Sequence, residues 1–242
     1  MIIKGLVAGI EDKKILNGVD IEIPKGKVIA VMGPNGSGKS TLSHVISGNP
    51  KYEVSSGSIT FDGEDILSME TDERARKGIF MSFQYPIAVP GVTVSGFMKA
   101  AMESQRGKIA FKEFLTELKE AMRLLEIPES FSNRYLNVGF SGGEKKRLEM
   151  LQMMLLKPRI CILDETDSGL DIDALKIVSL AVNNMRSDDR SFLIITHYSR
   201  ILGLIEPDSV AIMIDGRIVL HKGPELADEL EERGYDWIKN HL

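Results

Sequence analysis

The sequence predicts an α/β protein with a mostly parallel sheet, an N-terminal antiparallel β portion and an inserted helical subdomain. Three observations indicate this class. Short apolar strands alternate with helical stretches after residue 150, as in crossover connections between parallel strands. Several short β-like runs precede an Asp62-Gly63 turn signal. Between the N-terminal β-like runs and the alternating elements after residue 150, the stretch from about Val94 to Leu125 has helical periodicity.

The N-terminal part supplies the β portion and the first strand of the core. We expect β structure at residues 2–3, 19–23 and 58–61. The apolar run Val28-Ile-Ala-Val-Met32 is expected to be a buried strand that leads into a glycine-rich loop. The segment 42–46 then continues as a helix. This order of strand, loop and helix is the context that a phosphate-binding loop requires.

A stripe of apolar residues marks the helical insertion. Its members are spaced i, i+3, i+4, i+7, i+11 and i+14: Phe111, Phe114, Leu115, Leu118, Met122 and Leu125. We interpret this stripe as core packing rather than as a cofactor site. A helix from residue 142 then returns the chain to the sheet.

The remaining elements alternate, and we expect them at strand 160–163, helix 172–186, strand 192–196, and strands 210–214 and 217–220. Residues 1–242 are therefore expected to form one domain, in which about 1–83 and 151–242 make the core with its β portion. Residues of about 84–150 are expected to form the helical subdomain.

The composition restricts the possible partners. The chain has 242 residues, of which 27% are charged and 43% hydrophobic, and its net charge of −5 argues against a general nucleic-acid surface. The longest apolar runs fall far short of the ~20 residues that span a bilayer, and the N-terminus has no signal-peptide pattern. We expect a soluble, cytoplasmic protein with no nucleic-acid partner and no direct membrane insertion.

Cys161 is the single cysteine of the chain, and it lies in the apolar run 160–163. We interpret it as a small buried hydrophobe. It cannot form a disulfide within the chain, and one cysteine cannot hold an iron–sulfur cluster, which requires about four thiolates.

The loop Gly33-Pro-Asn-Gly-Ser-Gly-Lys-Ser-Thr41 satisfies the pattern G-x-x-x-x-G-K-[ST]. Backbone N–H groups of this loop and of the following helix N-terminus form a nest for phosphate oxygens. Lys39 is expected to reach the β- and γ-phosphates, and Ser40 to hold Mg²⁺. The sequence therefore predicts a nucleoside triphosphate site made of Gly33, Pro34, Asn35, Gly36, Ser37, Gly38, Lys39, Ser40 and Thr41.

Two acidic residues follow the predicted strand 160–163. Asp164 stands at the strand end, where it can hold Mg²⁺ directly or through water. Glu165 can orient or deprotonate the water that attacks the γ-phosphate. An ordinary acidic loop is the alternative interpretation, and the phosphate-binding loop upstream favours the catalytic one.

The segment Ser141-Gly-Gly-Glu144 opens the helix that returns to the sheet. Ser141 is a candidate N-cap with Glu144 as its capping-box partner, and a plain helix start would need no more than this. Alternatively, Ser141, Gly142 and Gly143 present a hydroxyl and backbone N–H groups to an anion.

With these motifs in this order, the chain resembles the ABC-type ATPases over its whole length. The resemblance implies a RecA-like core and hydrolysis of ATP to ADP and phosphate with Mg²⁺. It also implies a dimer in which Walker A of one copy faces the signature of a second copy in trans. The motifs and the residues that the resemblance assigns are Walker A at 33–41, the Q-loop at Gln84 (catalysis and Mg²⁺), the signature at Ser141, Gly142, Gly143 and Glu144, Walker B at 160–165, the D-loop at Ser168 and Asp171, and the switch histidine at His197.

Several local strings resemble one branch, the SufC family of the SUF iron–sulfur cluster assembly machinery. They are Thr166-Asp167 where transporter subunits usually have Pro-Thr or Pro-Ala, Phe140 before the signature, Tyr52-Glu-Val54, Phe83-Gln-Tyr-Pro86 with Pro90-Gly-Val92, the switch segment 196–202, and Gly234-Tyr-Asp-Trp237. This resemblance implies that ATP turnover drives conformational change in a scaffold of SufB with SufD, or of SufB alone, which holds the nascent cluster. The alternative is the nucleotide-binding subunit of a membrane ABC transporter. The segment 85–91, stiffened by two prolines, is either a docking surface or a plain connector.

Three further expectations concern single positions. Many ABC ATPases stack an aromatic ring on adenine from a position about twenty residues before Walker A, but the first aromatic residue here is Tyr52, so we expect weak discrimination between ATP and GTP. Asp167 either crowds Glu165 and lowers basal turnover or simply pairs within the D-loop. Lys145 and Lys146 are expected to be solvated charges.

Overall fold

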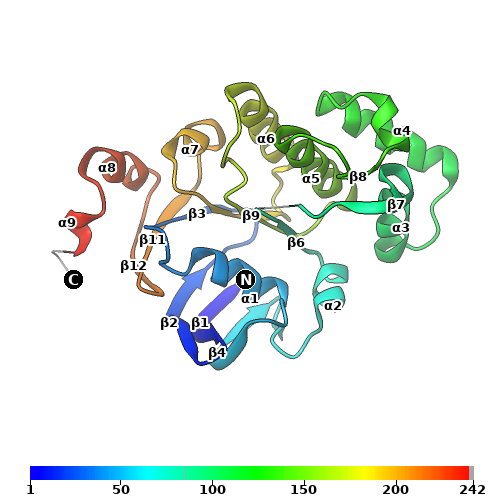
Figure 1. The fold of residues 1–242 in the computed structure, drawn as a ribbon. Helices are drawn as coiled ribbons and strands as arrows, with labels where there is room; N and C mark the ends of the chain where they lie inside the picture. Colours follow the sequence, from blue (N-terminus) through cyan, green and yellow to red (C-terminus); the bar gives the residue numbers. More distant parts are fainter. Residues whose placement is uncertain (85, 240–242) are drawn as a thin grey trace. The chain divides into compact units, whose positions relative to one another are not determined.

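An α/β core and a mainly helical part form two units of the chain, and the computed structural model describes residues 1–84 and 86–239 (Figure 1). Unit 1 comprises Met1–Met81, Arg159–Glu165 and Arg186–Leu242, and unit 2 comprises Ser82–Pro158 and Thr166–Met185. The predicted α/β class is confirmed, with a mainly parallel sheet and a separate antiparallel sheet.

The mainly parallel sheet has the strand order β12-β11-β3-β10-β9-β6. Parallel pairing joins β3 to β10 and β11, and β10 to β9, whereas β12 pairs antiparallel with β11. Every residue of β3, β9 and β10 is buried, as expected for central strands of a parallel sheet. The strands are β3 (Val28–Met32), β6 (Ile79–Ser82), β9 (Ile160–Asp164), β10 (Ser191–Ile195), β11 (Ser209–Ile214) and β12 (Arg217–Lys222).

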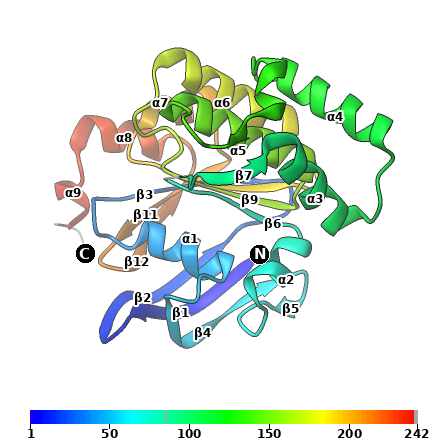
Figure 2. The same ribbon diagram turned by 45° about the vertical axis from the view of Figure 1, so that its right-hand side comes forward.

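The second sheet of unit 1 is antiparallel, in the order β2-β1-β4-β5. Helix α1 lies between this sheet and the mainly parallel sheet (Figure 2), and it contacts β1, β2, β4 and β9. One core cluster contains apolar residues from both sheets and from α1. The elements are β1 (Ile2–Ile10), β2 (Lys13–Glu22), β4 (Glu53–Phe61), β5 (Glu64–Asp65), α1 (Lys39–Ser47) and α2 (Thr71–Arg76). The C-terminal part of unit 1 adds α7 (Ser199–Ile205), α8 (Leu226–Arg233) and α9 (Asp236–Lys239).

Unit 2 is mainly helical. It contains α3 (Val94–Arg106), α4 (Phe111–Leu124), the 3₁₀ helix η1 (Glu129–Asn133), α5 (Gly142–Leu156), α6 (Ile172–Met185), and the short strands β7 (Val89–Thr93) and β8 (Tyr135–Leu136). The helical stretch predicted from 94 to 125 is two helices, because Gly107 ends α3 with a φ of 78°. Of the predicted stripe, Phe114, Leu118, Met122 and Leu125 are buried, whereas Phe111 is 64% exposed, so the stripe is core only in part.

The unit boundaries differ from the expected subdomain boundaries at two places. Residues 151–158 lie in unit 2, because α5 is one continuous helix that a boundary at 150 would cut. Residues 166–185 also lie in unit 2, since α6 packs against α5. Among the described residues, no helix is both long enough and apolar enough to cross a bilayer.

Candidate functional site

The glycine-rich loop joins β3 to α1, and two of its glycines take left-handed backbone angles, with φ of 79° at Gly36 and 106° at Gly38. Gly33 is required for a different reason: a Cβ at this position would lie 2.2 Å from the carbonyl oxygen of Met213. Gly38 is the N-cap of α1 and offers no side-chain cap. The first N–H groups of the helix are therefore left for an anion, as a phosphate site requires.

Lys39 lies inside this loop. Its Nζ donates hydrogen bonds to the carbonyl oxygens of Gly33, at 2.8 Å, and Pro34, at 3.0 Å. Burial lowers the pKa of Lys39, while the nearby carboxylates of Glu165 and Asp164 oppose that shift. The ammonium group is thus held beside two acids and among carbonyl oxygens that a phosphate could replace.

The two predicted acids meet the loop from β9. Asp164 is 1% exposed, and its Oδ1 accepts a hydrogen bond from the Ser40 hydroxyl at 3.1 Å. Burial raises the pKa of Asp164 to about 6; the Ser40 hydrogen bond lowers it, and the charge of Glu165 raises it further. An oxygen pair of this kind, one carboxylate and one hydroxyl beside a phosphate site, suits Mg²⁺.

Glu165 and His197 form a hydrogen-bonded pair, although 32 positions separate them in the sequence. His197 follows β10, and β10 pairs in parallel with β9, which ends at Asp164. The carboxyl ends of both strands therefore lie at one edge of the sheet. His197 Nε2 lies 2.5 Å from Glu165 Oε1, so Nε2 carries the proton that it donates to the carboxylate.

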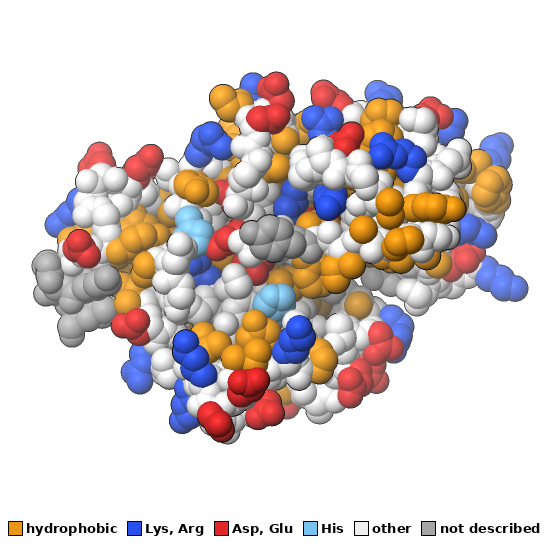
Figure 3. Space-filling view, viewed as in Figure 1, with side chains coloured by type: hydrophobic (Ala, Val, Ile, Leu, Met, Phe, Trp, Pro, Cys, Tyr) orange, Lys and Arg blue, Asp and Glu red, His pale blue; other side chains and the backbone are white. Residues whose placement is uncertain are grey.

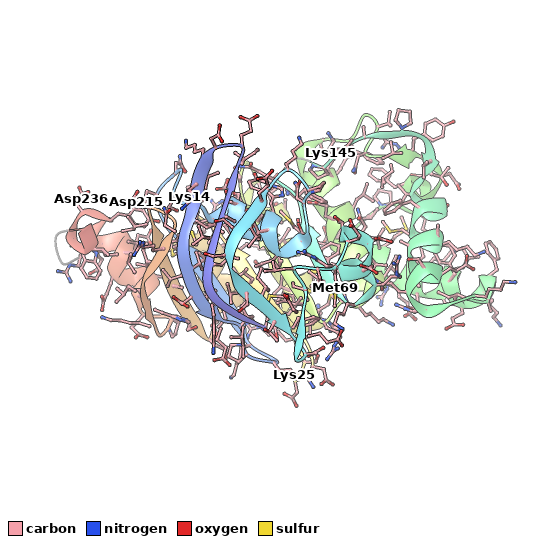
Figure 4. All side chains as sticks on the ribbon, turned by 90° about the horizontal axis from the view of Figure 1, so that it is seen from below. Lys14, Lys25, Met69, Lys145, Asp215 and Asp236 are labelled. Atoms are coloured by element: carbon pink, nitrogen blue, oxygen red, sulfur yellow. The ribbon has the colours of Figure 1, made fainter. Side chains whose placement is uncertain are left out.

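A cavity of about 410 Å³ joins these groups within unit 1. Glu165, His197 and six loop residues line it, together with five residues that the sequence analysis missed: Lys13, Lys14, Ile15, Asn17 and Asp215. The missed residues come from β2 and from the turn between β11 and β12, and Figure 4 shows Lys14 and Asp215 side by side. No local motif marks them, because their place in the site depends on the pairing of distant segments.

The turn after β11 is fastened to the phosphate-binding loop. Asn17 Nδ2 donates to the carbonyl oxygen of Asp215 at 2.8 Å, and the Gly216 N–H donates to the carbonyl oxygen of Ser37 at 2.8 Å. A Cβ at Gly216 would lie 2.0 Å from the carbonyl oxygen of Ile15, so only glycine fits. These contacts hold Asp215, which lines the cavity, next to β2 and the phosphate-binding loop.

The signature residues lie in unit 2 and make a complete capping box. The Ser141 hydroxyl accepts a hydrogen bond from the Glu144 N–H at 3.3 Å, and the Ser141 N–H donates to Glu144 Oε2 at 2.7 Å. That second hydrogen bond is the main reason why the pKa of Glu144 is lowered. The predicted helix start is therefore confirmed.

A cavity of about 470 Å³ opens beside the signature and is lined by Ser141, Gly143, Glu144, Arg147 and Asp171, among others. Asp171 caps α6 by accepting a hydrogen bond from the Ala174 N–H at 2.8 Å. Ser168 is exposed in the preceding turn. Gln84 also belongs to unit 2 and is half-buried, and its neighbour Tyr85 lies outside the described residues.

The expectation that Lys146 is a solvated charge is wrong. The residue is 4% exposed, and its Nζ lies 3.0 Å from Glu149 Oε2. Glu149 also accepts hydrogen bonds from the Ser82 hydroxyl at 2.9 Å and the Phe83 N–H at 2.7 Å, which fasten α5 to the residues just before Gln84. Burial raises the pKa of Glu149 in spite of these partners. Since Lys145 and Lys146 differ by one position on a helix, only packing decides which one is buried.

Comparisons with known proteins identify the family. The model of the family described as ABC transporter matches residues 16–168, which include the glycine-rich loop, the signature, and Asp164 and Glu165 at the end of β9. The chain belongs to the ABC transporter family of ATPases. It hydrolyses ATP, and the resemblance of this ABC ATPase to the SufC family is confirmed by its relatives.

Two relatives cover almost the whole of this ABC ATPase. It is 54% identical to "Vegetative protein 296" of Bacillus subtilis (strain 168), over 99% of this chain and 93% of that protein. It is 49% identical to "Probable ATP-dependent transporter SufC" of Escherichia coli (strain K12), over 98% of this chain and 97% of that protein.

The solved structures of similar proteins agree on the fold. A dimeric post-hydrolysis state of an ATP-binding cassette bound to ADP and phosphate is 22% identical, with a TM-score of 0.79, over 92% of this chain and 98% of that one. A structure of the ATP-binding subunit of an ABC transporter has a TM-score of 0.81 at 22% identity, over 99% of this chain and 98% of that one. At 22% identity, this structural similarity supports the fold alone. The roles of single residues are argued from the geometry of the site.

Proposed function

We propose that this ABC ATPase hydrolyses Mg-ATP as part of a two-copy unit and drives conformational change in a SufB/SufD-type scaffold during iron–sulfur cluster assembly. The main support for ATP hydrolysis at this site is that two hydrogen-bonded pairs lie beside the glycine-rich loop. These pairs are Ser40 with Asp164 and His197 with Glu165. The proposed role in iron–sulfur cluster assembly is supported by the relative named SufC, which is 49% identical over almost the whole chain.

The residues around the loop fit Mg²⁺. Ser40 and Asp164 would hold the ion, which would supply charge neutralisation at the phosphate oxygens. Among the described residues, no group of three or more histidines, cysteines or acids could hold a metal by itself. That fits Mg²⁺, which is usually bound by one or two carboxylates together with substrate phosphates.

Glu165 is placed to act on water. Its carboxylate would accept a proton as the water oxygen attacks the γ-phosphorus and the bond to the β-phosphate oxygen of ADP breaks. His197 donates to the same carboxylate, so it would orient Glu165 and lie near the γ-phosphate. Lys39 would exchange the carbonyl oxygens of Gly33 and Pro34 for the β- and γ-phosphate oxygens.

The signature would act on a second copy. Ser141, Gly142 and Gly143 lie at the N-terminus of the 15-residue helix α5 beside an open cavity, a geometry suited to a γ-phosphate. ATP bound in one copy would thus supply contacts across the dimer that disappear on hydrolysis, which makes the nucleotide a switch for association.

The scaffold would bind near the segment that follows Gln84. Ile87 is 80% exposed, and Val89 and Val92 of β7 are also exposed, so apolar side chains gather over β7 (Figure 3). Phe83 is 50% exposed on the other side of Gln84. Apolar residues that flank the Q-loop in this way would let a bound scaffold bias the position of Gln84.

The test uses tagged Glu165→Gln protein with Mg-ATP in the native lysate. Gln keeps an oxygen that accepts from His197 but removes the proton acceptor, so the variant should bind ATP and trap the ATP-bound complex. Lys39→Ala is the matched control, because it should lose nucleotide binding and trap nothing. Mass spectrometry that identifies SufB-like subunits in the Glu165→Gln sample alone would support the proposal. A polytopic permease in their place would refute the scaffold role and indicate a transporter subunit.

A further inference from the structure

The two-residue turn between β11 and β12 brings Asp215 to the phosphate-binding loop. Asp215 and Gly216 have φ of 48° and 75°, as in the Asp-Gly turns that close tight hairpins. The Gly216 N–H donates to the Ser37 carbonyl oxygen at 2.8 Å, and a Cβ at Gly38 would lie 3.5 Å from the Gly216 Cα. Asp215 therefore directly precedes a residue that lies against Gly38, the N-cap of α1 and a part of the proposed phosphate site.

The carboxylate of Asp215 is exposed at this cavity and is not neutralised by a fixed cation. Lys14 lies beside Asp215 in Figure 4, and Lys13 lines the same cavity, but neither lysine forms an ion pair with Asp215 in the described part of the chain. A carboxylate so close to a phosphate site repels the phosphate oxygens. It would weaken the binding of a nucleotide unless the same ligand gave it a hydrogen-bond donor.

The ribose carries the donors of a nucleotide that are nearest to its phosphates. The ionised phosphate oxygens only accept hydrogen bonds, whereas the 2′- and 3′-hydroxyls can donate to a carboxylate. In dinucleotide-binding folds an acidic side chain accepts a hydrogen bond from the ribose in this way. The N–H groups of the base lie farther from the phosphates, so the ribose hydroxyls are the donors that suit a carboxylate next to the phosphate-binding loop.

The residues that line the cavity with Asp215 from β2 provide no selective contact for a base. They are Lys13, Lys14, Ile15 and Asn17, and none of them has an aromatic ring. Asn17 Nδ2 donates to the backbone carbonyl oxygen of Asp215 at 2.8 Å, so it positions the turn. Ile15 offers an apolar side chain that any base can contact. A directional contact to the nucleoside is therefore expected at the ribose rather than at the base.

We propose that Asp215 is a specificity-determining residue whose carboxylate accepts hydrogen bonds from the ribose hydroxyls of the bound nucleotide. The site then selects ribonucleotides without distinguishing adenine from guanine. The inference rests on the phosphate-binding role proposed above for the loop. It requires no movement of the protein and no property of the scaffold.

The test is Asp215→Gly in the intact chain, because glycine adopts a φ of 48° without strain. A hydrogen bond to a charged acceptor predicts an increase of about 10- to 100-fold in the Kd for Mg-ADP when that acceptor is removed. The Kd for Mg-GDP should rise by the same factor. The Kd for Mg-pyrophosphate, which has no ribose, should stay the same or fall, since a charge that repels phosphate is lost.

Mg-2′,3′-dideoxy-ADP completes a cycle in which the ligand and the protein each lose one partner. It should bind the unsubstituted protein about 10- to 100-fold more weakly than Mg-ADP does. The Asp215→Gly protein should bind the two ligands with nearly equal Kd, because the hydroxyls have lost their acceptor. Asp215→Asn keeps an acceptor oxygen, so its Kd for Mg-ADP should lie between those of the other two proteins.

Asp62→Gly is the matched control, because Asp62 and Gly63 form a second Asp-Gly turn of unit 1, with φ of 54° and 81°, and do not line the cavity. It should leave every Kd unchanged.

Three results for Asp215→Gly would overturn the inference. They are an unchanged Kd for Mg-ADP, an equal weakening of Mg-ADP and Mg-2′,3′-dideoxy-ADP, and a parallel loss of Mg-pyrophosphate binding, which would mean that the turn only supports the loop. Failure of the unsubstituted protein to bind both Mg-ADP and Mg-pyrophosphate would refute the proposed nucleotide site itself, so the two failures are distinguishable.

Discussion

Asp164→Asn should make the nucleotide-free protein more stable, although it removes a proposed Mg²⁺ ligand. Asp164 is 1% exposed, and burial raises its pKa from 3.8 to about 6. The folded form therefore holds its proton more tightly than the unfolded form does, and the free energy of unfolding falls as the pH rises from about 3.8 to about 6. At about 1.4 kcal/mol per pKa unit, the full loss is about 3 kcal/mol, reached above pH 6.

Asparagine cannot ionise, and its side-chain oxygen can still accept the hydrogen bond from Ser40. The variant should thus exceed the natural protein by about 3 kcal/mol at pH 7.5 and by about half of that at pH 5, where the native carboxyl is largely protonated. Urea unfolding at both pH values, with a chelator present to exclude Mg²⁺, measures the difference. Asp12→Asn, at an exposed position, is the control and should change little.

Two results would refute this reasoning. One is a variant that is less stable than the natural protein at pH 7.5, which would mean that the ionised carboxylate is net stabilising in the fold. The other is a stability difference that is the same at pH 5 and pH 7.5, since a desolvated carboxyl must lose its effect as it is protonated. Mg²⁺-dependent nucleotide affinity should be lost in either case if Asp164 holds the ion.

Three further predictions follow from the site and its surroundings. In the described part of the chain, no tyrosine, phenylalanine or tryptophan lines the nucleotide cavity, so the base lacks a stacking contact worth ~1–3 kcal/mol. The isolated subunit should therefore bind ATP and GTP with comparable Kd, and a strong preference for ATP would contradict this. Lys146→Met should destabilise the protein by about 3–5 kcal/mol in urea unfolding, because the buried Glu149 loses its cationic partner and keeps only its hydrogen bonds from Ser82 and Phe83. Lys146→Met with Glu149→Gln should recover most of the loss; no recovery would mean that packing rather than charge is responsible. Cys161 is fully buried, which raises the pKa of its thiol, so iodoacetamide should modify it only after unfolding; rapid labelling of the native protein would refute the buried placement.

Local pattern alone was sufficient for much of the fold. The apolar run 28–32 is β3, and the strand predicted at 160–163 is β9, one residue longer. The capping box at Ser141 and Glu144 was also predictable, because both of its hydrogen bonds join residues three positions apart. The phosphate-binding loop was recognisable for the same reason, since its glycines and Lys39 act within nine consecutive residues.

The break in the helical stretch was harder to place. Gly107 lies in a region whose apolar periodicity continues on both sides, and periodicity does not indicate whether a glycine ends a helix or is tolerated inside it. The exposure of Phe111 has a similar origin. Its spacing matches that of the buried Phe114 and Leu118, but it stands at the first residue of α4, where a side chain can extend beyond the packed face.

The α/β class, the phosphate-binding loop, the acids Asp164 and Glu165 at the end of β9 and the family could all be predicted from the sequence, because helical and strand periods, turn residues and contiguous motifs are local properties. Packing of the whole chain was needed to show that Glu165 meets His197, that Asp215 and Asn17 line the cavity, and that Lys146 is buried while Lys145 is not. Those contacts join residues from separate elements or depend on which helix face is covered. They follow from strand pairing and packing of the whole chain, for which no single stretch of sequence carries a signal.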